Sequence, residues 1–128
     1  DLADVEAIVR NQSARLIDAR APERFEGRSE TIDKRAGHIA GAVNHFYKWN
    51  LADDGTMLAP ERLRDNFTKV LAGKEPNEVV MYCGSGVTAC HNLLAMEHAG
   101  LTGTPLYPGS WSEWSSDPDR PSEKGPAK

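Results

Sequence analysis

The hydrophobic pattern near the start of the chain predicts two short helices around one strand. Apolar side chains recur at helical spacing over residues 2–9, and polar residues end this run. The apolar pair Leu16 and Ile17 predicts a brief strand that ends at Asp18. Pro22 follows, and proline suits the first turn of a helix because an N–H group is not needed there.

The middle of the chain predicts a loop, a second strand and a longer helix. Residues 26–37 are polar and contain two glycines, so we expect a loop. The apolar stretch 39–43 predicts a short strand. After Pro60, apolar residues keep helical spacing as far as Leu71, and Gly73 is placed to end that helix.

The clearest strand covers residues 78–82, whose continuous β-branched character is typical of a buried parallel strand. A helix is predicted over residues 89–98, with Gly100 as its left-handed cap. Residues 106–107 predict a last strand, and residues 109–114 predict a helical turn. Strands that alternate with helices indicate an α/β domain, with a mostly parallel central sheet covered by helices on both faces.

Length and composition limit the class of protein. A chain of 128 residues suffices for one domain, so we expect residues 1–128 to form it, with 116–128 as a polar, proline-rich tail. There are 15 basic and 19 acidic residues, whereas a nucleic-acid-binding surface needs a basic excess. No apolar run approaches the roughly 20 residues that span a bilayer. We therefore expect a cytoplasmic protein with neither nucleic acid nor membrane as a partner.

The two cysteines are too few for a disulfide framework, which leaves their roles open. Cys83 stands where the buried strand stops and a helix begins, the place where open α/β sheets bind ligands. Gly84 and Gly86 allow the backbone after it to aim several N–H groups at the sulfur, and such donors favour a thiolate. The sequence therefore predicts a nucleophile at Cys83. The alternative is a small core residue at the end of a strand.

The spacing around Cys83 argues against three other chemistries that use similar loops. A cysteine phosphatase needs an arginine six residues after the nucleophile, where this chain has Ala89. A serine hydrolase elbow needs a glycine two residues before Ser85, and that position is the cysteine. A thioredoxin-like pair needs Cys-x-x-Cys, whereas Cys90 lies seven residues on. The place of Cys90 on the predicted helix indicates buried packing rather than a redox role.

The chain resembles the rhodanese family of sulfurtransferases, and in particular the catalytic C-terminal domain of its tandem two-domain enzymes. The resemblance covers nearly the whole chain and implies a rhodanese-like three-layer fold. It rests on four motifs in the family's order, Leu16-Ile17-Asp18-Ala19-Arg20, Gly37-His38-Ile39-Ala40-Gly41-Ala42-Val43-Asn44, Cys83-Gly84-Ser85-Gly86-Val87-Thr88 and Gly109-Ser110-Trp111-Ser112-Glu113-Trp114. One departure is Ala40, where the family usually has proline. It affects the stiffness of the loop and not the chemistry.

The resemblance implies that Cys83 takes a sulfur atom from a small donor, holds it as a persulfide and passes it to a thiol, a thioredoxin-like protein or cyanide. No metal or other cofactor is implied. Arg24 matches the family position that contacts the anionic donor. Asp18 matches a family aspartate that lies close to the cysteine loop. The alternative for Arg24 is a solvated arginine on a helix. The alternative for Asp18 is an aspartate that caps the next turn. The active loop would comprise Gly84, Ser85, Gly86, Val87 and Thr88.

The loop also bears on the choice of donor. Family members that favour thiosulfate carry cationic side chains after the cysteine, whereas this chain has Gly84 and Ser85. That resembles 3-mercaptopyruvate sulfurtransferases, in which Ser85 would bind the donor and help its enolate to form. Those enzymes commonly add a second arginine, for which this chain offers only Arg28, Lys34 and Arg35. We therefore expect a slight preference for 3-mercaptopyruvate over thiosulfate.

Two further expectations follow from the resemblance. An N-terminal rhodanese domain would complete the cleft if this chain is half of a tandem enzyme. The alternative from another functional class is a non-catalytic rhodanese module that binds a partner.

The histidines and tryptophans are assigned structural roles. The four histidines show no ligand spacing, so we expect no metal site, and we expect His38 to hydrogen-bond its own loop. Trp111 and Trp114 lie three residues apart, which places them on one side of a turn beside the active loop.

Overall fold

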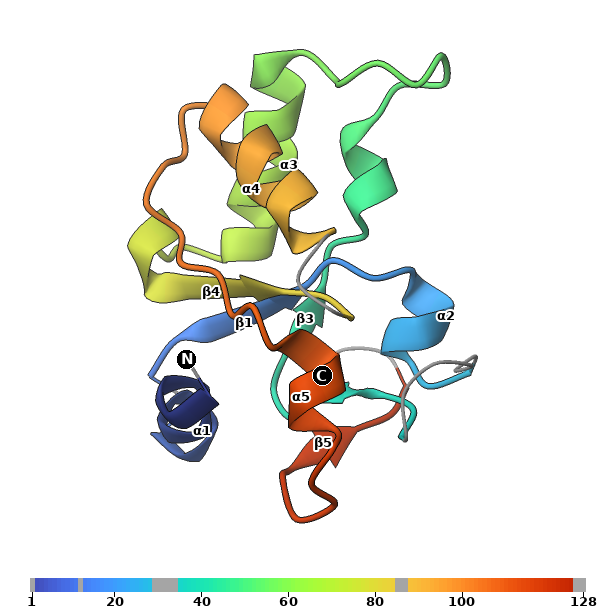
Figure 1. Ribbon diagram of the computed structural model, residues 1–128. Helices are drawn as coiled ribbons and strands as arrows, with labels where there is room; N and C mark the ends of the chain where they lie inside the picture. The colour runs from blue at the N-terminus through green and yellow to red at the C-terminus, as the bar shows by residue number, and fades with distance from the viewer. Residues whose placement is uncertain (1, 12, 29–34, 85–87, 126–128) are drawn as a thin grey trace.

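A small parallel sheet lies at the centre of the domain (Figure 1). The computed structural model describes residues 2–11, 13–28, 35–84 and 88–125. The strand order of the sheet is β3-β1-β4, and its members are β1 (Arg15–Asp18), β3 (Val43–Asn44) and β4 (Val79–Tyr82). Both outer strands run parallel to β1. The carboxyl ends of the strands therefore meet at one edge, where α/β sheets bind ligands.

Helices cover both faces of this sheet (Figure 1). One face carries α3 (Pro60–Leu71) and α4 (Ala89–His98). The other carries α1 (Leu2–Asn11) and α5 (Ser110–Trp114). The remaining helical elements are α2 (Pro22–Phe25), which lies beside the end of the sheet, and the single turns η1 (Tyr47–Asn50) and η2 (Pro76–Glu78). This arrangement confirms the predicted α/β class.

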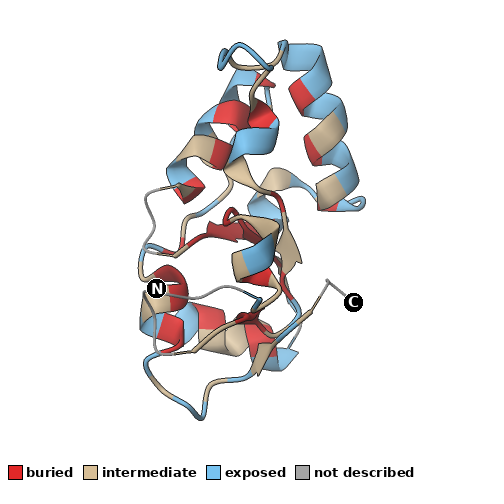
Figure 2. Cartoon of the chain, turned by 90° about the vertical axis from the view of Figure 1, so that its right-hand side faces the viewer, coloured by how far each residue is buried: buried red, intermediate tan, exposed pale blue. Residues whose placement is uncertain are grey.

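The two faces of β4 contribute to two separate hydrophobic cores, which explains why this strand is apolar throughout. Val79 and Met81 pack with α3 and α4, whereas Val80 and Tyr82 pack with α1 and α5. Successive side chains of a strand point to opposite faces, so a strand covered on both sides has no position for a solvated residue. Figure 2 shows these buried positions along the sheet. The second core also contains the fully buried pair Trp111 and Trp114.

The single strand predicted over 39–43 is wrong, because the chain turns in its middle. Residues 38–39 form β2 (His38–Ile39), the chain turns at Ala40 and Gly41, and β3 begins at Val43. Gly41 has a φ of 85°, a left-handed conformation that glycine adopts at little cost. The two halves of the apolar stretch therefore belong to different sheets.

The C-terminal region contains a strand that the sequence does not predict. Residues 122–123 form β5 (Ser122–Glu123), which pairs antiparallel with β2, so this part of the tail is ordered on the domain. The strand predicted at 106–107 is reduced to one parallel bridge between Leu106 and Met81. The left-handed cap predicted at Gly100 is confirmed by its φ of 81°. Within the described parts of the chain, no helix has the length and hydrophobicity needed to cross a membrane.

Candidate active site

Cys83 follows the last residue of β4 at the edge where the parallel strands end. The register pairs Tyr82 of β4 with Asp18 of β1, so the cysteine comes directly after the paired strand ends. The residue is 1% exposed, and its sulfur is therefore shielded from bulk water. The predicted loop residues Ser85, Gly86 and Val87 lie outside the described residues, so the ring of amide donors stays a prediction.

Helix α5 holds the main chain of the cysteine from one side. The N–H of Cys83 donates to Oγ of Ser110 at 3.0 Å, and the N–H of Trp111 donates to the carbonyl of Cys83 at 2.9 Å. The N–H of Ser112 donates to the carbonyl of Gly84 at 2.9 Å. Because a trans peptide points its C=O and N–H in opposite directions, the bond from Trp111 turns the Gly84 N–H away from α5. The predicted position of the tryptophan turn beside the cysteine is confirmed.

Ser110 is a site residue that sequence reasoning did not single out. It is fully buried, and its φ of 55° lies in the left-handed region that non-glycine residues rarely adopt. In this conformation Oγ accepts from Cys83 and donates to the carbonyl of Tyr107 at 2.9 Å. A strained residue whose hydroxyl bonds the main chain of the candidate nucleophile indicates a positioning role.

Asp18 pairs with Arg20, a second residue that sequence reasoning did not single out. Nη2 of Arg20 lies 2.7 Å from Oδ2 of Asp18, and Nε lies 3.0 and 3.1 Å from the two carboxylate oxygens. The N–H of Arg20 also donates to Oδ1 at 2.9 Å, which is the turn-capping role considered for Asp18. Burial, together with the negative charge of Asp18, holds the pKa of Tyr82 well above its ordinary value. The support of the cysteine loop by Asp18 stays a prediction.

The tertiary structure brings Arg24 of α2 next to Gly84. A Cβ atom on Gly84 would lie 3.5 Å from Nη2 and 3.6 Å from Nη1 of Arg24. The guanidinium group therefore faces the open side of the residue that follows Cys83. This places a positive charge beside the residue that directly follows Cys83. Contact between Arg24 and a donor stays a prediction.

The candidates for a second arginine that would bind the donor make other contacts, as far as the structure describes them. Arg28 is exposed and pairs with Glu26 at 3.1 Å. Arg35 donates to the C-terminal segment, including the carbonyls of Asp117 and Arg120 at 3.1 Å each. Lys34 lies outside the described residues.

The prediction that Cys90 packs in the core is wrong, since the residue is exposed. The face of α4 that points inward carries Ala89, Asn92, Ala95 and Met96. Leu94, one helical turn after Cys90 on the same side of α4, is itself 60% exposed. No disulfide joins Cys90 to Cys83.

The hydrogen bond expected for His38 within its own loop is also wrong. Nδ1 of His38 lies 2.7 Å from the carbonyl oxygen of Phe25, and the two rings stack 3.8 Å apart. The reason is that the imidazole of His38 packs against the end of α2, and therefore bonds that helix rather than its own loop. Among the residues with described placement, no three His, Cys, Asp or Glu side chains come together as metal ligands.

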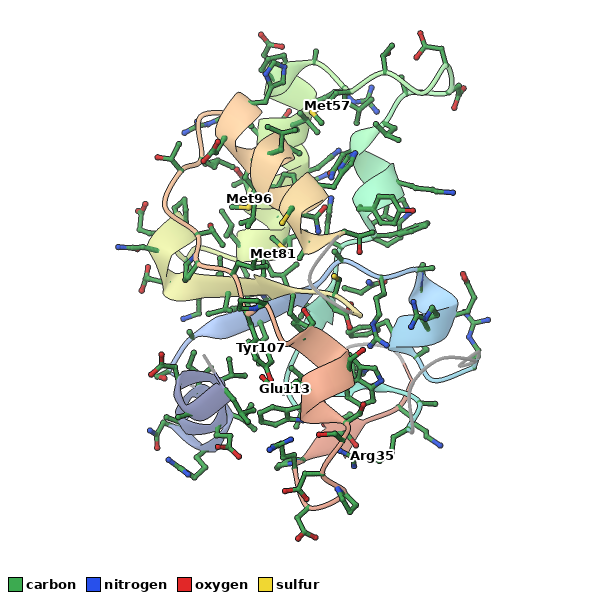
Figure 3. The ribbon with its side chains drawn as sticks, viewed as in Figure 1. Arg35, Met57, Met81, Met96, Tyr107 and Glu113 are labelled. Atoms are coloured by element: carbon green, nitrogen blue, oxygen red, sulfur yellow. The ribbon has the colours of Figure 1, made fainter. Side chains whose placement is uncertain are left out.

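Two cavities lie away from Cys83, on the side of α1. One of about 220 Å³ is lined by residues of α1 and of the C-terminal segment, and the other, of about 530 Å³, by residues of α1 and of 107–113. In the second, Tyr107 donates to Oε1 of Glu113 at 2.8 Å (Figure 3). Burial and this carboxylate raise the pKa of Tyr107. Neither cavity is lined by Cys83, Gly84 or Arg24, so both are poor candidates for the donor site.

Comparison with known proteins identifies the family. The family model of the rhodanese-like domain matches residues 1–117. The chain belongs to the rhodanese family. This rhodanese domain is 49% identical over 125 residues to "Probable 3-mercaptopyruvate sulfurtransferase" of Pseudomonas aeruginosa. The match covers 98% of this chain and 44% of that protein. It is 35% identical over 109 residues to "Thiosulfate/3-mercaptopyruvate sulfurtransferase 1, mitochondrial" of Arabidopsis thaliana, with 84% and 28% covered.

A solved structure is also similar to this rhodanese domain. The 3-mercaptopyruvate sulfurtransferase from Leishmania major is 41% identical, with a TM-score of 0.71, and the match covers 80% of this chain and 30% of that one. The domain thus spans less than half of the length of the relatives described here.

Proposed function

We propose that this domain is a sulfurtransferase that moves a sulfane sulfur through a persulfide on Cys83. The observation that carries the proposal is that the guanidinium of Arg24 faces Gly84, the residue directly after Cys83 at the end of β4. A nucleophile and a cation at the edge where parallel strands end suit a small anionic donor. The names of the sulfurtransferase relatives support this choice.

The proposed first step depends on the donor. With 3-mercaptopyruvate, the Cys83 thiolate attacks the thiol sulfur and an S–S bond forms. The carbon–sulfur bond breaks, and its electron pair leaves on the enolate of pyruvate, which takes a proton at carbon. With thiosulfate, the thiolate attacks the outer sulfur, and the S–S bond of the donor breaks to release sulfite. Neither route needs an external oxidant or reductant.

The second step returns the cysteine to its starting state. A thiolate acceptor, small or carried by a thioredoxin-like protein, attacks the terminal sulfur, and the S–S bond to Cys83 breaks. Cyanide as the acceptor would leave as thiocyanate.

We propose 3-mercaptopyruvate as the slightly preferred donor. The guanidinium of Arg24 can bind a carboxylate with two parallel hydrogen bonds. A long cationic side chain at position 84 would compete for the space next to that guanidinium, which glycine does not occupy. A kcat/KM for thiosulfate that exceeds the value for 3-mercaptopyruvate by about tenfold, or 1.4 kcal/mol, would contradict this preference.

The persulfide is tested by mass spectrometry of the intact chain after treatment with each donor. We expect an adduct of one sulfur atom on the native chain and on Cys90→Ser, and none on Cys83→Ser. The Cys90 variant is a matched control because it removes the other, exposed thiol. An adduct that persists on Cys83→Ser would move the chemistry away from Cys83. A native chain that forms no adduct with either donor would favour the non-catalytic module.

The setting of the reaction is proposed on the same basis. The lengths of the relatives support a second, N-terminal rhodanese domain as the partner that completes the cleft. A thiol that carries a persulfide must be recycled by reduction, which favours a reducing compartment such as the cytoplasm.

A further inference from the structure

The C-terminal segment 117–125, called the C-terminal strap below, crosses the side of the domain on which β2 lies (Figure 1). The family match ends at Asp117, so nearly all of the strap lies beyond it. Within the strap, β5 pairs with β2, and the N–H of Ala40 donates to the carbonyl of Pro121 at 3.2 Å. The strap is therefore an integral part of the fold, although its sequence predicts only a polar tail.

One side chain, Arg35, holds much of the strap (Figure 3). Its Nη2 donates to the carbonyls of Asp117 and Arg120, both at 3.1 Å. Its Nη1 donates to Oγ of Ser122 at 3.2 Å and to the carbonyl of Pro118 at 3.4 Å. The planar guanidinium thus makes four directed bonds, which a lysine ammonium cannot reproduce with the same geometry.

The same residue leads from the strap to the candidate nucleophile. Nε1 of Trp111 donates to the carbonyl of Arg35 at 2.9 Å, and the Arg35 guanidinium lies 5.9 Å from the centre of the Trp111 ring. The guanidinium of Arg20 also lies over this ring, at 5.1 Å. Because the main-chain N–H of Trp111 binds the carbonyl of Cys83, the strap reaches the cysteine through two residues.

A second connection leads from the strap to the element that carries Arg24. Oε1 of Glu123 lies 3.7 Å from Nε2 of His38, whose other nitrogen binds the carbonyl of Phe25, the last residue of α2. The N–H of Gly125 donates to the carbonyl of Glu26 at 2.7 Å. The strap is therefore tied both to α2 and to the cysteine.

We propose that the C-terminal strap, held by Arg35, sets the position of the Arg24 guanidinium relative to Cys83 and so determines how well an anionic reagent is accepted there. The inference deepens the proposed function, since an anionic donor would use this site. The attraction between two charges falls with distance, and a misplacement on the order of 1 Å in a reacting geometry costs up to about 100-fold in rate. Arg35 is accordingly a positioning residue that acts through the strap and Trp111.

The test compares two alkylating reagents of similar size on Cys83, in a Cys90→Ser background. Iodoacetate is anionic and iodoacetamide is neutral, so the ratio of their rates reports the cationic field at the sulfur. Arg35→Lys keeps the charge and loses the fork of hydrogen bonds. We expect this variant to lower the ratio by about threefold or more, toward the value for Arg24→Gln. Arg62→Lys, the same substitution on the exposed side of α3, is the control and leaves the ratio unchanged.

A purely structural role for Arg35 would change both rates by the same factor, and an unchanged ratio in a folded Arg35→Lys variant would overturn the proposal. If that variant does not fold, Ser122→Ala removes one acceptor of Arg35 and keeps the backbone bonds of the strap, and its ratio decides in the same way. The assay needs no sulfur donor. A native chain without a persulfide would therefore refute the proposed function, while the alkylation ratio would still decide the role of the strap.

Discussion

Asp18 and Arg20 form a buried ion pair at the end of β1, with Nη2 of Arg20 2.7 Å from Oδ2 of Asp18. Their side chains are 0% and 1% exposed. Nη2 of Arg20 also donates to the carbonyl of Gly37 at 2.6 Å, and the guanidinium lies over the ring of Trp111. The pair therefore connects β1 with the segment before β2 and with α5.

Breaking this ion pair is expected to destabilise the domain strongly. Asp18→Asn leaves the Arg20 guanidinium buried without a compensating charge, which costs about 3–5 kcal/mol. The free energy of unfolding, measured with a chemical denaturant, should fall by that amount. Asp65→Asn, at an exposed position of α3, is the matched control, with a change within about 0.5 kcal/mol. A loss below about 1 kcal/mol for Asp18→Asn would mean that water reaches Arg20.

Two substitutions of Ser110 distinguish the energetic cost of backbone strain from the contribution of a hydrogen bond. Ser110→Ala removes the acceptor of the Cys83 N–H and keeps the left-handed φ, so we expect a loss of about 2 kcal/mol in the free energy of unfolding. Ser110→Gly removes the same acceptor but relieves strain of about 1 kcal/mol, and it should be the more stable of the two. Both losses are read from denaturant curves. Equal stability of the two variants would show that the φ of 55° carries no cost.

The position of Arg24 next to Gly84 predicts how substitution at position 84 affects turnover. A Cβ there would make ordinary van der Waals contact with Arg24, so Gly84→Ala should keep kcat/KM for 3-mercaptopyruvate within about threefold. Gly84→Arg places a second guanidinium against the first and should lower kcat/KM by about tenfold or more, mainly through KM. Steady-state turnover with 3-mercaptopyruvate measures both. Native kinetics for Gly84→Arg would exclude Arg24 as the donor contact.

The pH dependence of stability should depend on His45. Burial lowers the pKa of His45, and its hydrogen bond to Asn50, at 3.0 Å, opposes this only in part. The folded state therefore binds a proton less readily than the unfolded state, whose histidine titrates at about 6.5. The stabilisation is complete above that pH and is lost as pH falls through 6.5 toward the lower pKa of the folded state.

Denaturant curves between about pH 7 and about pH 5 test this expectation. The free energy of unfolding should fall less steeply with decreasing pH in His45→Gln than in the native chain. The exposed His98 at the end of α4 provides the control, and His98→Gln should keep the native slope. Parallel curves for all three proteins would show that His45 titrates as in the unfolded chain.

Local features of the site were open to prediction from the sequence. The run that ends at Tyr82 is apolar at every position and is followed by glycine residues, which predicts a buried strand, a turn and a helix in that order. The same pattern predicts Cys83 at a strand end, where the structure places it. Residues 39–43 show the limit, because Gly41 divides a locally uniform apolar stretch between two sheets.

By itself, the sequence determined the α/β class, the position of Cys83 and the packing of Trp111 and Trp114, because each depends on contiguous residues and their spacing. Only the tertiary structure decided that Arg24 faces Gly84 and that Cys90 points outward. It also decided that the polar C-terminal strap pairs with β2. The physical reason is that these outcomes depend on which distant segments pack together, and the contacts of a guanidinium or a thiol are set by that packing rather than by neighbours in the chain.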